Sequence, residues 1–235
     1  MGRAFEYRKA RKEKRWSQMA KTFTRIGKDI AIAVREGGPD PSTNSRLRAA
    51  IQNAKGANMP KDNVESAIKR ASNKDEKAYQ EVVYEGYGPY GVPIVVECAT
   101  DNPTRTVANI RLYFNRAGGA LGTSGSLDFM FTRKGVFKLN PEGLNMEELE
   151  LELIDLGAED IFVHEDEIEV HTPFAGYGAM QKALEEKGLP VVSSGVQRIP
   201  TSTKSLTEEE GEVIMNLIEK IEDDDDVQAV YHNVE

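Results

Sequence analysis

The chain has 235 residues, of which 39% are hydrophobic and 29% are charged. This composition is typical of a globular protein and is too apolar for a chain that is disordered throughout. No stretch approaches the roughly 18 consecutive apolar residues that a membrane-spanning helix needs, which argues against a transmembrane protein. The single cysteine, Cys98, cannot close an intrachain disulfide, and the basic N-terminus lacks the apolar segment of a secretory signal. The expected location is therefore cytoplasmic.

The net charge of −9 hides a strong asymmetry between the two ends of the chain. Residues 1–77 carry 19 basic and nine acidic side chains, a net charge of +10. Residues 78–235 carry 11 basic and 30 acidic side chains, a net charge of −19. A split of this kind indicates an electrostatic partner for the basic end.

The most basic segment comes first. Residues 3–15 contain seven basic and two acidic side chains. Like charges at this density repel one another, so we expect this arm to be frayed without a partner. An amphipathic helix is predicted from about Ser17 to Glu36, because apolar side chains recur there at helical spacing. Gly37 and Gly38 end it.

Two shorter helices complete the basic third of the chain. One is predicted from about Asn44 to Ala57, and the other begins near Pro60, a favoured first helical position. Short amphipathic helices bury their apolar faces only against one another or a neighbour, which predicts a basic helical domain over residues 1–77. Residues 72–78 have no apolar periodicity and are predicted to be a linker.

From Tyr79 onward the pattern changes to strands. The segments YQEVVYEG and VPIVVECAT are predicted strands joined by a tight turn. A helix follows from Pro103 to about Ala117, and then a further strand from Leu127 to Phe131. The segment 78–133 therefore supplies the order ββαβ.

Residues 134–203 form a self-contained series in the order βαββαβ, which is the ferredoxin-like arrangement. Residues 204–235 then supply a helix capped by Thr207 and a last strand. We therefore expect a multidomain α and α+β protein with an N-terminal helical domain and two α/β domains. The third domain (134–203, ferredoxin-like) is inserted in the second, which is discontinuous (78–133 and 204–235). The elements predicted within the inserted domain are strands at 136–139, 160–163, 168–171 and 191–199 and helices at 146–156 and 174–187.

Two glycine-rich stretches invite a nucleotide-binding interpretation. EGYGPYG formally matches G-x-G-x-x-G, but a strand follows it where a dinucleotide site needs a helix N-terminus, which favours a hairpin turn. The stretch at 118–126 lacks the Lys-Ser/Thr pair of a P-loop. It is either a tightly turned connection or a backbone surface that touches a phosphate or a partner.

The segment TDNPTRT opens the helix that begins at Pro103. Asn102 is a suitable cap, and the free N–H groups of a first helical turn attract anions. Arg105 adds a positive charge, whereas Asp101 opposes an anion. Plain capping and a nucleic-acid phosphate site both remain open.

The sequence offers no catalytic or metal-binding frame. None of the three histidines has metal-ligand spacing, and no G-x-S-x-G or comparable nucleophile motif is present. The acidic run Asp223–Asp226 lacks EF-hand spacing and is predicted to be a solvated loop. We therefore expect a protein that is not an enzyme, with no cofactor and no small-molecule substrate.

The basic N-terminal region is the strongest chemical signal. A charge of +10 in 77 residues exceeds what solubility needs in a chain that is otherwise acidic, and phosphate backbones attract such a region through counterion release. The alternative is a merely solvated cationic surface. The predicted nucleic-acid-binding residues are Arg3, Arg8, Lys9, Arg11, Lys12, Lys14, Arg15, Lys21, Arg25, Lys28, Arg46, Arg48, Lys55, Lys61 and Arg105.

Four segments of the chain carry distinctive motifs: SRLRAAIQNAKGANMPKDNVESAIKR (45–70), YEGYGPYGVPIVVECATDNPTRTVANIR (84–111), GGALGTSGSLDFMFTRKG (118–135) and VYHN (230–233). These motifs resemble those of the YebC/PmpR family of bacterial regulatory proteins, which has mitochondrial translational activators among its relatives. One part of the chain departs from that pattern, because the family usually begins with a Gly-His-Ser-Lys-Trp run and this chain reads MGRAFEYRKARKEKRW.

The resemblance implies a three-domain fold with no catalytic activity and no cofactor. It also implies one of two roles: a DNA-binding regulator of transcription, or a ribosome-associated factor that assists translation. The expected partner is accordingly promoter DNA or ribosomal RNA, with the ribosome as a further candidate. The acidic remainder of the chain would be repelled by duplex DNA at close range, although salt screens this repulsion beyond about 8 Å.

Overall fold

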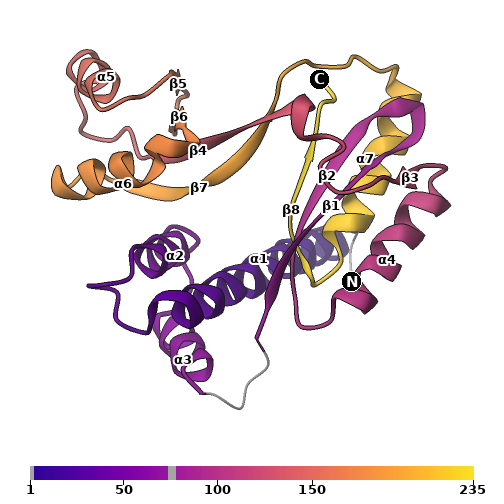
Figure 1. Ribbon diagram of the computed structural model, residues 1–235, viewed down its shortest axis with the longest axis horizontal. Coiled ribbons are helices and arrows are strands. Elements are labelled where there is room, and N and C mark those ends of the chain that lie inside the picture. The colour runs from indigo at the N-terminus through magenta and orange to yellow at the C-terminus, as the bar shows by residue number, and fades with distance from the viewer. Residues whose placement is uncertain (1–2, 74–77) are drawn as a thin grey trace. The chain divides into compact units, whose positions relative to one another are not determined.

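The computed structural model describes the backbone of residues 3–73 and 78–235 and the side chains of residues 17–73 and 78–235. The chain divides into two compact units, Met1–Tyr79 and Gln80–Glu235. The first unit is helical, and the second carries two antiparallel four-stranded sheets with their helices (Figure 1). The predicted fold class, helical and α+β, is confirmed.

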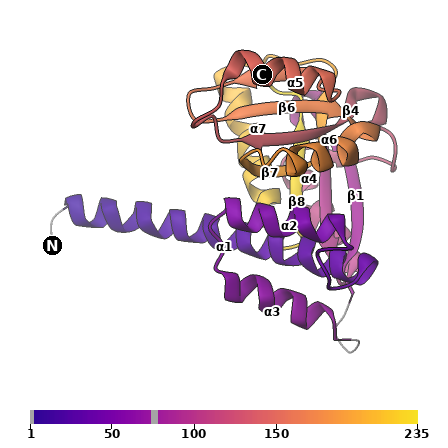
Figure 2. The ribbon, with the colours of Figure 1, turned by 90° about the vertical axis from the view of Figure 1, so that its left-hand side faces the viewer.

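The first unit contains three helices, α1 (Arg3–Gly37), α2 (Ser45–Gly56) and α3 (Lys61–Ala71). Helix α1 begins 14 residues before the predicted start at Ser17, so the prediction of a frayed arm is wrong for the backbone. No glycine or proline occurs in α1 before Gly27, and Ala, Arg, Lys and Glu all have high helix propensity, which outweighs the repulsion between like charges. Figure 2 shows α1 running well past the other two helices at its N-terminal end.

One asparagine joins the end of α1 to the start of α2. The buried Asn44 caps α2 by accepting a hydrogen bond from the Leu47 N–H, 3.0 Å away. Its amide nitrogen donates to the carbonyl oxygens of Ala33 (2.7 Å) and Gly38 (2.8 Å). A Cβ atom at Gly37 would lie 2.7 Å from the Asn44 side chain, so only glycine fits there. The core of the unit consists of Ile26, Ile30, Ala33, Val34, Leu47, Ala50, Ala54, Val64, Ala67 and Ala71.

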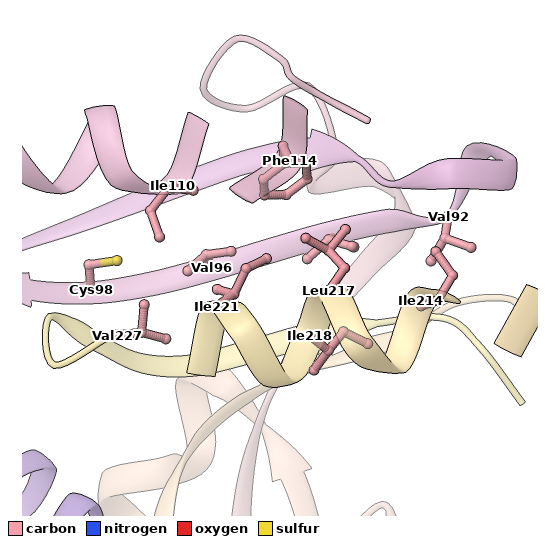
Figure 3. Close-up of a cluster of buried hydrophobic side chains, with 11 residues drawn as sticks. Val92, Val96, Cys98, Ile110, Phe114, Ile214, Leu217, Ile218, Ile221 and Val227 are labelled. Carbon is pink, nitrogen blue, oxygen red and sulfur yellow. The ribbon is translucent and has the colours of Figure 1, made fainter. Parts of the chain in front are cut away.

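The first sheet of the second unit has the strand order β3-β1-β2-β8. Helices α4 and α7 cover one face of it, where Phe114 of α4 and Leu217 of α7 meet Val96 of β2 (Figure 3). Cys98 is buried in the same core, as expected for a structural thiol. The elements are β1 (Gln80–Tyr87), β2 (Pro93–Thr100), α4 (Pro103–Arg116), β3 (Ala120–Leu121), α7 (Glu208–Glu222) and β8 (Val227–His232).

The strand predicted from Leu127 to Phe131 is not formed there. The third strand of this sheet is the short β3, which pairs with the end of β1, and Asp128–Met130 form a 3-10 turn. Phe131 instead opens a strand of the second sheet, where it pairs with Pro200. The prediction failed because the buried side chains of Leu127 and Phe131 gave a strand-like pattern across a turn.

The second sheet has the strand order β5-β6-β4-β7 with all neighbours antiparallel, which is the ferredoxin-like arrangement. Helices α5 and α6 pack on one face around Leu153, Phe137 and Met180. The proposed boundaries of three domains remain a prediction. The elements are β4 (Phe131–Leu139), α5 (Met146–Asp155), β5 (Asp160–Val163), β6 (Ile168–Pro173), α6 (Tyr177–Glu186) and β7 (Val191–Pro200).

Candidate nucleic-acid interface

The basic arm lies on the N-terminal half of α1. Its backbone is helical from Arg3 onward. The side chains up to residue 16 lie outside the described residues, so their contact with nucleic acid stays a prediction. The predicted residues in this segment are Arg3, Arg8, Lys9, Arg11, Lys12, Lys14 and Arg15.

The next three cations along α1 are less accessible than the sequence suggested. Lys21 and Arg25 are half-buried, and Lys28 is buried. The ammonium group of Lys28 lies 5.2 Å from the centre of the Tyr79 ring, which is a cation–π contact within the first unit. An ammonium group held in this way is poorly placed to reach a phosphate, so the case for Lys28 is weakened.

Two arginines of α2 serve the fold of the first unit. Arg46 forms an exposed ion pair with Glu36 at 2.7 Å. Arg48 donates hydrogen bonds to the carbonyl oxygens of Pro41 (2.8 Å) and Ser42 (3.3 Å), and so holds the α1–α2 loop. The Arg48 side chain is therefore turned toward this loop, which weakens its assignment to a phosphate.

The remaining predicted cations of this unit are exposed. Lys55 is exposed in the last turn of α2. Lys61, at the start of α3, has a side chain that is 87% exposed, with Glu65 3.4 Å away. Lys69 and Arg70 are not among the predicted residues, but both are exposed in the last turn of α3. Positive charges are favoured near a helix C-terminus, so the position of these two residues at the end of the predicted third helix could have identified them as exposed cations.

At the start of α4, Arg105 pairs with carboxylates of the protein itself. This residue is one of the predicted phosphate-binding residues. Asn102 caps the helix by accepting from the Arg105 N–H at 3.1 Å, as predicted. The Arg105 guanidinium donates to Asp226 at 2.7 Å and to Asp101 at 3.0 Å. These two carboxylates raise the pKa of Arg105 further above its ordinary value. Plain capping is thus the better supported of the two alternatives for this segment.

The acidic run after α7 is anchored to α4, contrary to the prediction of a solvated loop. Asp226 is buried and accepts hydrogen bonds from the hydroxyl groups of Thr100 (3.1 Å) and Thr106 (2.8 Å). Asp224 accepts from the amide of Asn109 and from the hydroxyl of Tyr113, each at 3.0 Å. Burial, followed by the hydrogen bond to Asp224, raises the pKa of Tyr113. The run therefore fastens the last loop of the chain to a helix about 120 residues earlier.

The glycine-rich stretch at 118–126 is a tight connection that another internal carboxylate holds. The buried Glu85 accepts hydrogen bonds from the N–H groups of Gly125 (3.0 Å) and Leu127 (2.7 Å). The Ser126 hydroxyl donates to the same carboxylate at 3.4 Å. Backbone N–H groups in such a turn can bind an anion. Here the Glu85 carboxylate takes the place of that anion, so these donors are already satisfied within the protein.

EGYGPYG forms the hairpin between β1 and β2, as predicted. The Gly88 N–H donates to the Val92 carbonyl at 2.8 Å, and Gly91 has a φ of +68°. A strand follows the turn, so the geometry of a pyrophosphate site at a helix N-terminus is not present here.

Two lysines on the second sheet are paired with neighbouring carboxylates. Lys134 lies 2.6 Å from Asp160, and Lys138 lies 2.6 Å from Glu167. The hydrogen bond from Lys134 lowers the pKa of Asp160, and the bond to Asp160 raises the pKa of Lys134. These ion pairs leave little net positive charge at either lysine for a phosphate backbone.

Two further findings concern metal ions and membranes. Among residues 17–73 and 78–235, no group of three or more His, Cys, Asp or Glu side chains is arranged to hold a metal ion. None of the helices in the described part of the chain has the length and apolar character needed to cross a membrane.

Family models match almost the whole chain. Residues 3–74 match the "TACO1/YebC protein N-terminal domain" and residues 79–234 match the "TACO1/YebC second and third domain". The chain belongs to the TACO1/YebC family. The resemblance inferred from the motifs is therefore confirmed.

Curated relatives of this TACO1/YebC protein are similar over its full length. A protein from Flavobacterium johnsoniae is 61% identical and one from Cytophaga hutchinsonii is 59% identical, each over 234 residues. Each alignment covers 100% of this chain, with 99% and 98% of the relatives covered, respectively. Both are named "Probable transcriptional regulatory protein", a name that describes a regulator and no enzymatic activity.

A solved structure shares the fold. The crystal structure of a conserved hypothetical protein from Aquifex aeolicus matches with a TM-score of 0.82 and 37% sequence identity. The match covers 93% of this chain and 90% of the other. The match therefore extends over both units.

Proposed function

We propose that this protein is a non-enzymatic regulator in the cytoplasm that binds nucleic acid through its basic N-terminal helical unit. The observation that carries the proposal is the charge division: +10 in residues 1–77 against −19 in the remainder. A polyanion is attracted to the first unit through counterion release and is repelled by most of the second. The regulatory names of the relatives are in keeping with this role.

Promoter DNA is the first candidate target, because the relatives carry the name of transcriptional regulators. Ribosomal RNA is the second candidate, and one observation favours it. The second unit carries 30 acidic residues, which oppose a long duplex at close range but suit a surface that also contains basic proteins, as a ribosome does. Under the second alternative the protein acts as a translation factor.

Crosslinking in cells, followed by sequencing of the attached nucleic acid, separates the two targets. Enrichment of promoter fragments over total genomic DNA supports the transcriptional role. Enrichment of defined ribosomal RNA positions, with co-sedimentation of the protein with ribosomes, supports the translational role. Recovery of neither above the level of an unrelated acidic protein contradicts the proposal.

A further inference from the structure

Two of the three most exposed large hydrophobic side chains in the described part of the chain lie on one turn of α5. Leu151 is 68% exposed and Ile154 is 58% exposed, and only Phe129 exceeds them at 75%. Leu149 and Leu153 of the same helix are buried in the core of the second sheet, so Leu151 lies opposite them, with Ile154 beside it. Single exposed apolar residues are ordinary on a protein surface, but adjoining ones rimmed by polar groups are typical of an interaction site.

Carboxylates surround this apolar pair. On a helix, the neighbours of a side chain are those three and four positions away. For Leu151 these neighbours are Ile154 and three acids, and Ile154 has a fourth acid four positions before it. All four acids are exposed, and within the described residues no hydrogen bond or ion pair engages their side chains. The four acids are Glu147, Glu148, Glu150 and Asp155.

Other acids of the same region do have cationic partners. Residues 142–169 carry 12 acidic and no Lys or Arg side chains. Lysines from outside this segment pair with five of these acids, which are Glu152, Glu159, Asp160, Glu167 and Glu169. The four carboxylates around Leu151 and Ile154 receive no such partner from the second unit, so they are available to a cation from another molecule.

The stability of α5 does not account for this arrangement. Asp155 lies in the last turn of the helix, where a negative charge is unfavourable, and that turn contains no basic residue. Glu148 and Glu152 are like charges four positions apart, which also destabilises a helix. Proteins retain locally unfavourable arrangements mainly where these serve a function. A cationic partner would relieve the repulsion and cover the apolar pair at the same time.

We propose that the outer face of α5, formed by Leu151, Ile154, Glu147, Glu148, Glu150 and Asp155, binds a basic amphipathic segment of a partner protein. We name it the α5 face. The partner supplies apolar side chains for the leucine and the isoleucine and Lys or Arg side chains for the carboxylates. Nucleic acid and an anionic membrane surface do not fit, because like charges repel at close range. The inference goes beyond the proposed function, since it assigns a protein ligand to the second unit.

The first test measures binding of a labelled peptide to the full-length protein by fluorescence anisotropy. The probe is a helical peptide of Leu and Lys, about 14 residues or four turns long, with Leu at helical spacing. Leu151→Ala/Ile154→Ala should bind it about 10-fold more weakly or worse, because the apolar contact is lost. Both side chains are mostly exposed, so this variant is expected to fold normally. A peptide of the same composition with Leu and Lys alternating should bind the wild type more weakly.

Charge is tested separately. Glu147→Gln/Glu148→Gln/Asp155→Asn should weaken binding of the helical peptide and reduce its dependence on salt, because surface ion pairs are screened by salt. No measurable binding of this peptide to the wild type at low ionic strength would overturn the proposal.

Helix α7 supplies matched controls, since it is also acidic and Figure 1 shows it at the other end of the second unit. Glu208→Gln/Glu209→Gln/Glu212→Gln makes the same change in total charge with three exposed acids. Met215→Ala removes an apolar side chain of 52% exposure. Both controls should keep the wild-type affinity. If they weaken binding as much as the α5 variants do, the peptide responds to total charge and the proposal is wrong.

Photocrosslinking in cells identifies the natural occupant. A photoreactive amino acid replaces Leu151 in the full-length protein, and mass spectrometry gives the attached peptides. We expect peptides of other proteins that are rich in Lys and Arg, and their loss when Glu147→Lys/Asp155→Lys is added. Crosslinks to acidic peptides, to nucleic acid or to a second copy of this chain would overturn the proposal, as would a yield no higher than that from the same replacement at Met215.

This outcome is separable from that of the proposed function. Charge reversal in the basic arm should abolish nucleic-acid binding and leave binding of the Leu and Lys peptide unchanged. Conversely, the α5 variants should bind nucleic acid as the wild type does. Loss of peptide binding in the arm variant would place the peptide on the wrong unit and contradict the assignment to α5.

Discussion

Reversing four charges in the basic arm should abolish nucleic-acid binding. The variant Arg8→Glu/Lys9→Glu/Arg11→Glu/Lys12→Glu changes the net charge of residues 3–15 from +5 to −3. If about six arm residues meet phosphates in the wild type, log affinity should fall with log salt at a slope of roughly −4 to −5. With four of these contacts removed, any residual binding should have a slope of about −1 to −2. Fluorescence anisotropy over a salt series measures both quantities.

The variant should remain folded, because Glu has a helix propensity close to those of Lys and Arg and is favoured near a helix N-terminus. The two-site variant Lys9→Glu/Lys12→Glu has a matched control in Lys182→Glu/Lys220→Glu, which makes the same change in total charge on α6 and α7. The control should keep the wild-type slope. Equal losses in the two variants would mean that total charge, and not the arm, governs binding.

Replacing Asp226 with alanine should destabilise the second unit by about 3 kcal/mol, within a range of ~2–4 kcal/mol. This buried carboxylate accepts from Arg105 at 2.7 Å and from the hydroxyl groups of Thr100 and Thr106, so its removal takes one acceptor from each of three donors and leaves Arg105 with Asp101 alone. For a unit of this size, the melting temperature should fall by roughly 6–12 °C. Calorimetry or a denaturant titration followed by circular dichroism measures the loss.

The neighbouring exposed residue supplies the control. Asp225→Ala should change stability by no more than about 0.5 kcal/mol, as is usual for surface substitutions. The affinity of Asp226→Ala for nucleic acid at a temperature where it is folded should equal that of the wild type, because Asp226 lies in the second unit. A loss of stability no greater than that of Asp225→Ala would show that Asp226 does not anchor the last loop.

Local patterns in the sequence predicted local structure well. The cap at Thr207 was predicted from its spacing to Glu210, and the structure has the capping box there, with both hydrogen bonds formed. The strand after EGYGPYG excluded a dinucleotide site and correctly indicated a hairpin. These features depend on residues within a few positions of one another, so a sequence contains all the information they require.

Long-range polar contacts were not predictable in the same way. Arg105 and Asp226 are 121 positions apart, and nothing in either segment indicates that they meet. Glu85 lies 42 positions before Leu127, which it holds in a turn, and without it the segment resembled a strand. The start of α1 was missed for another reason, since charge repulsion was given more importance than helix propensity.

The functional surfaces were predicted in part. The local charge of residues 1–77 pointed to the first unit, and the exposed Lys55 and Lys61 agree with that assignment.

The most direct test of the central claim is to map which peptides of the full-length protein crosslink to bound nucleic acid. Ultraviolet crosslinking followed by mass spectrometry gives these positions. We expect most crosslinks within residues 1–73. Crosslinks confined to the acidic segments at 135–235, with none in the basic helical unit, would contradict the account.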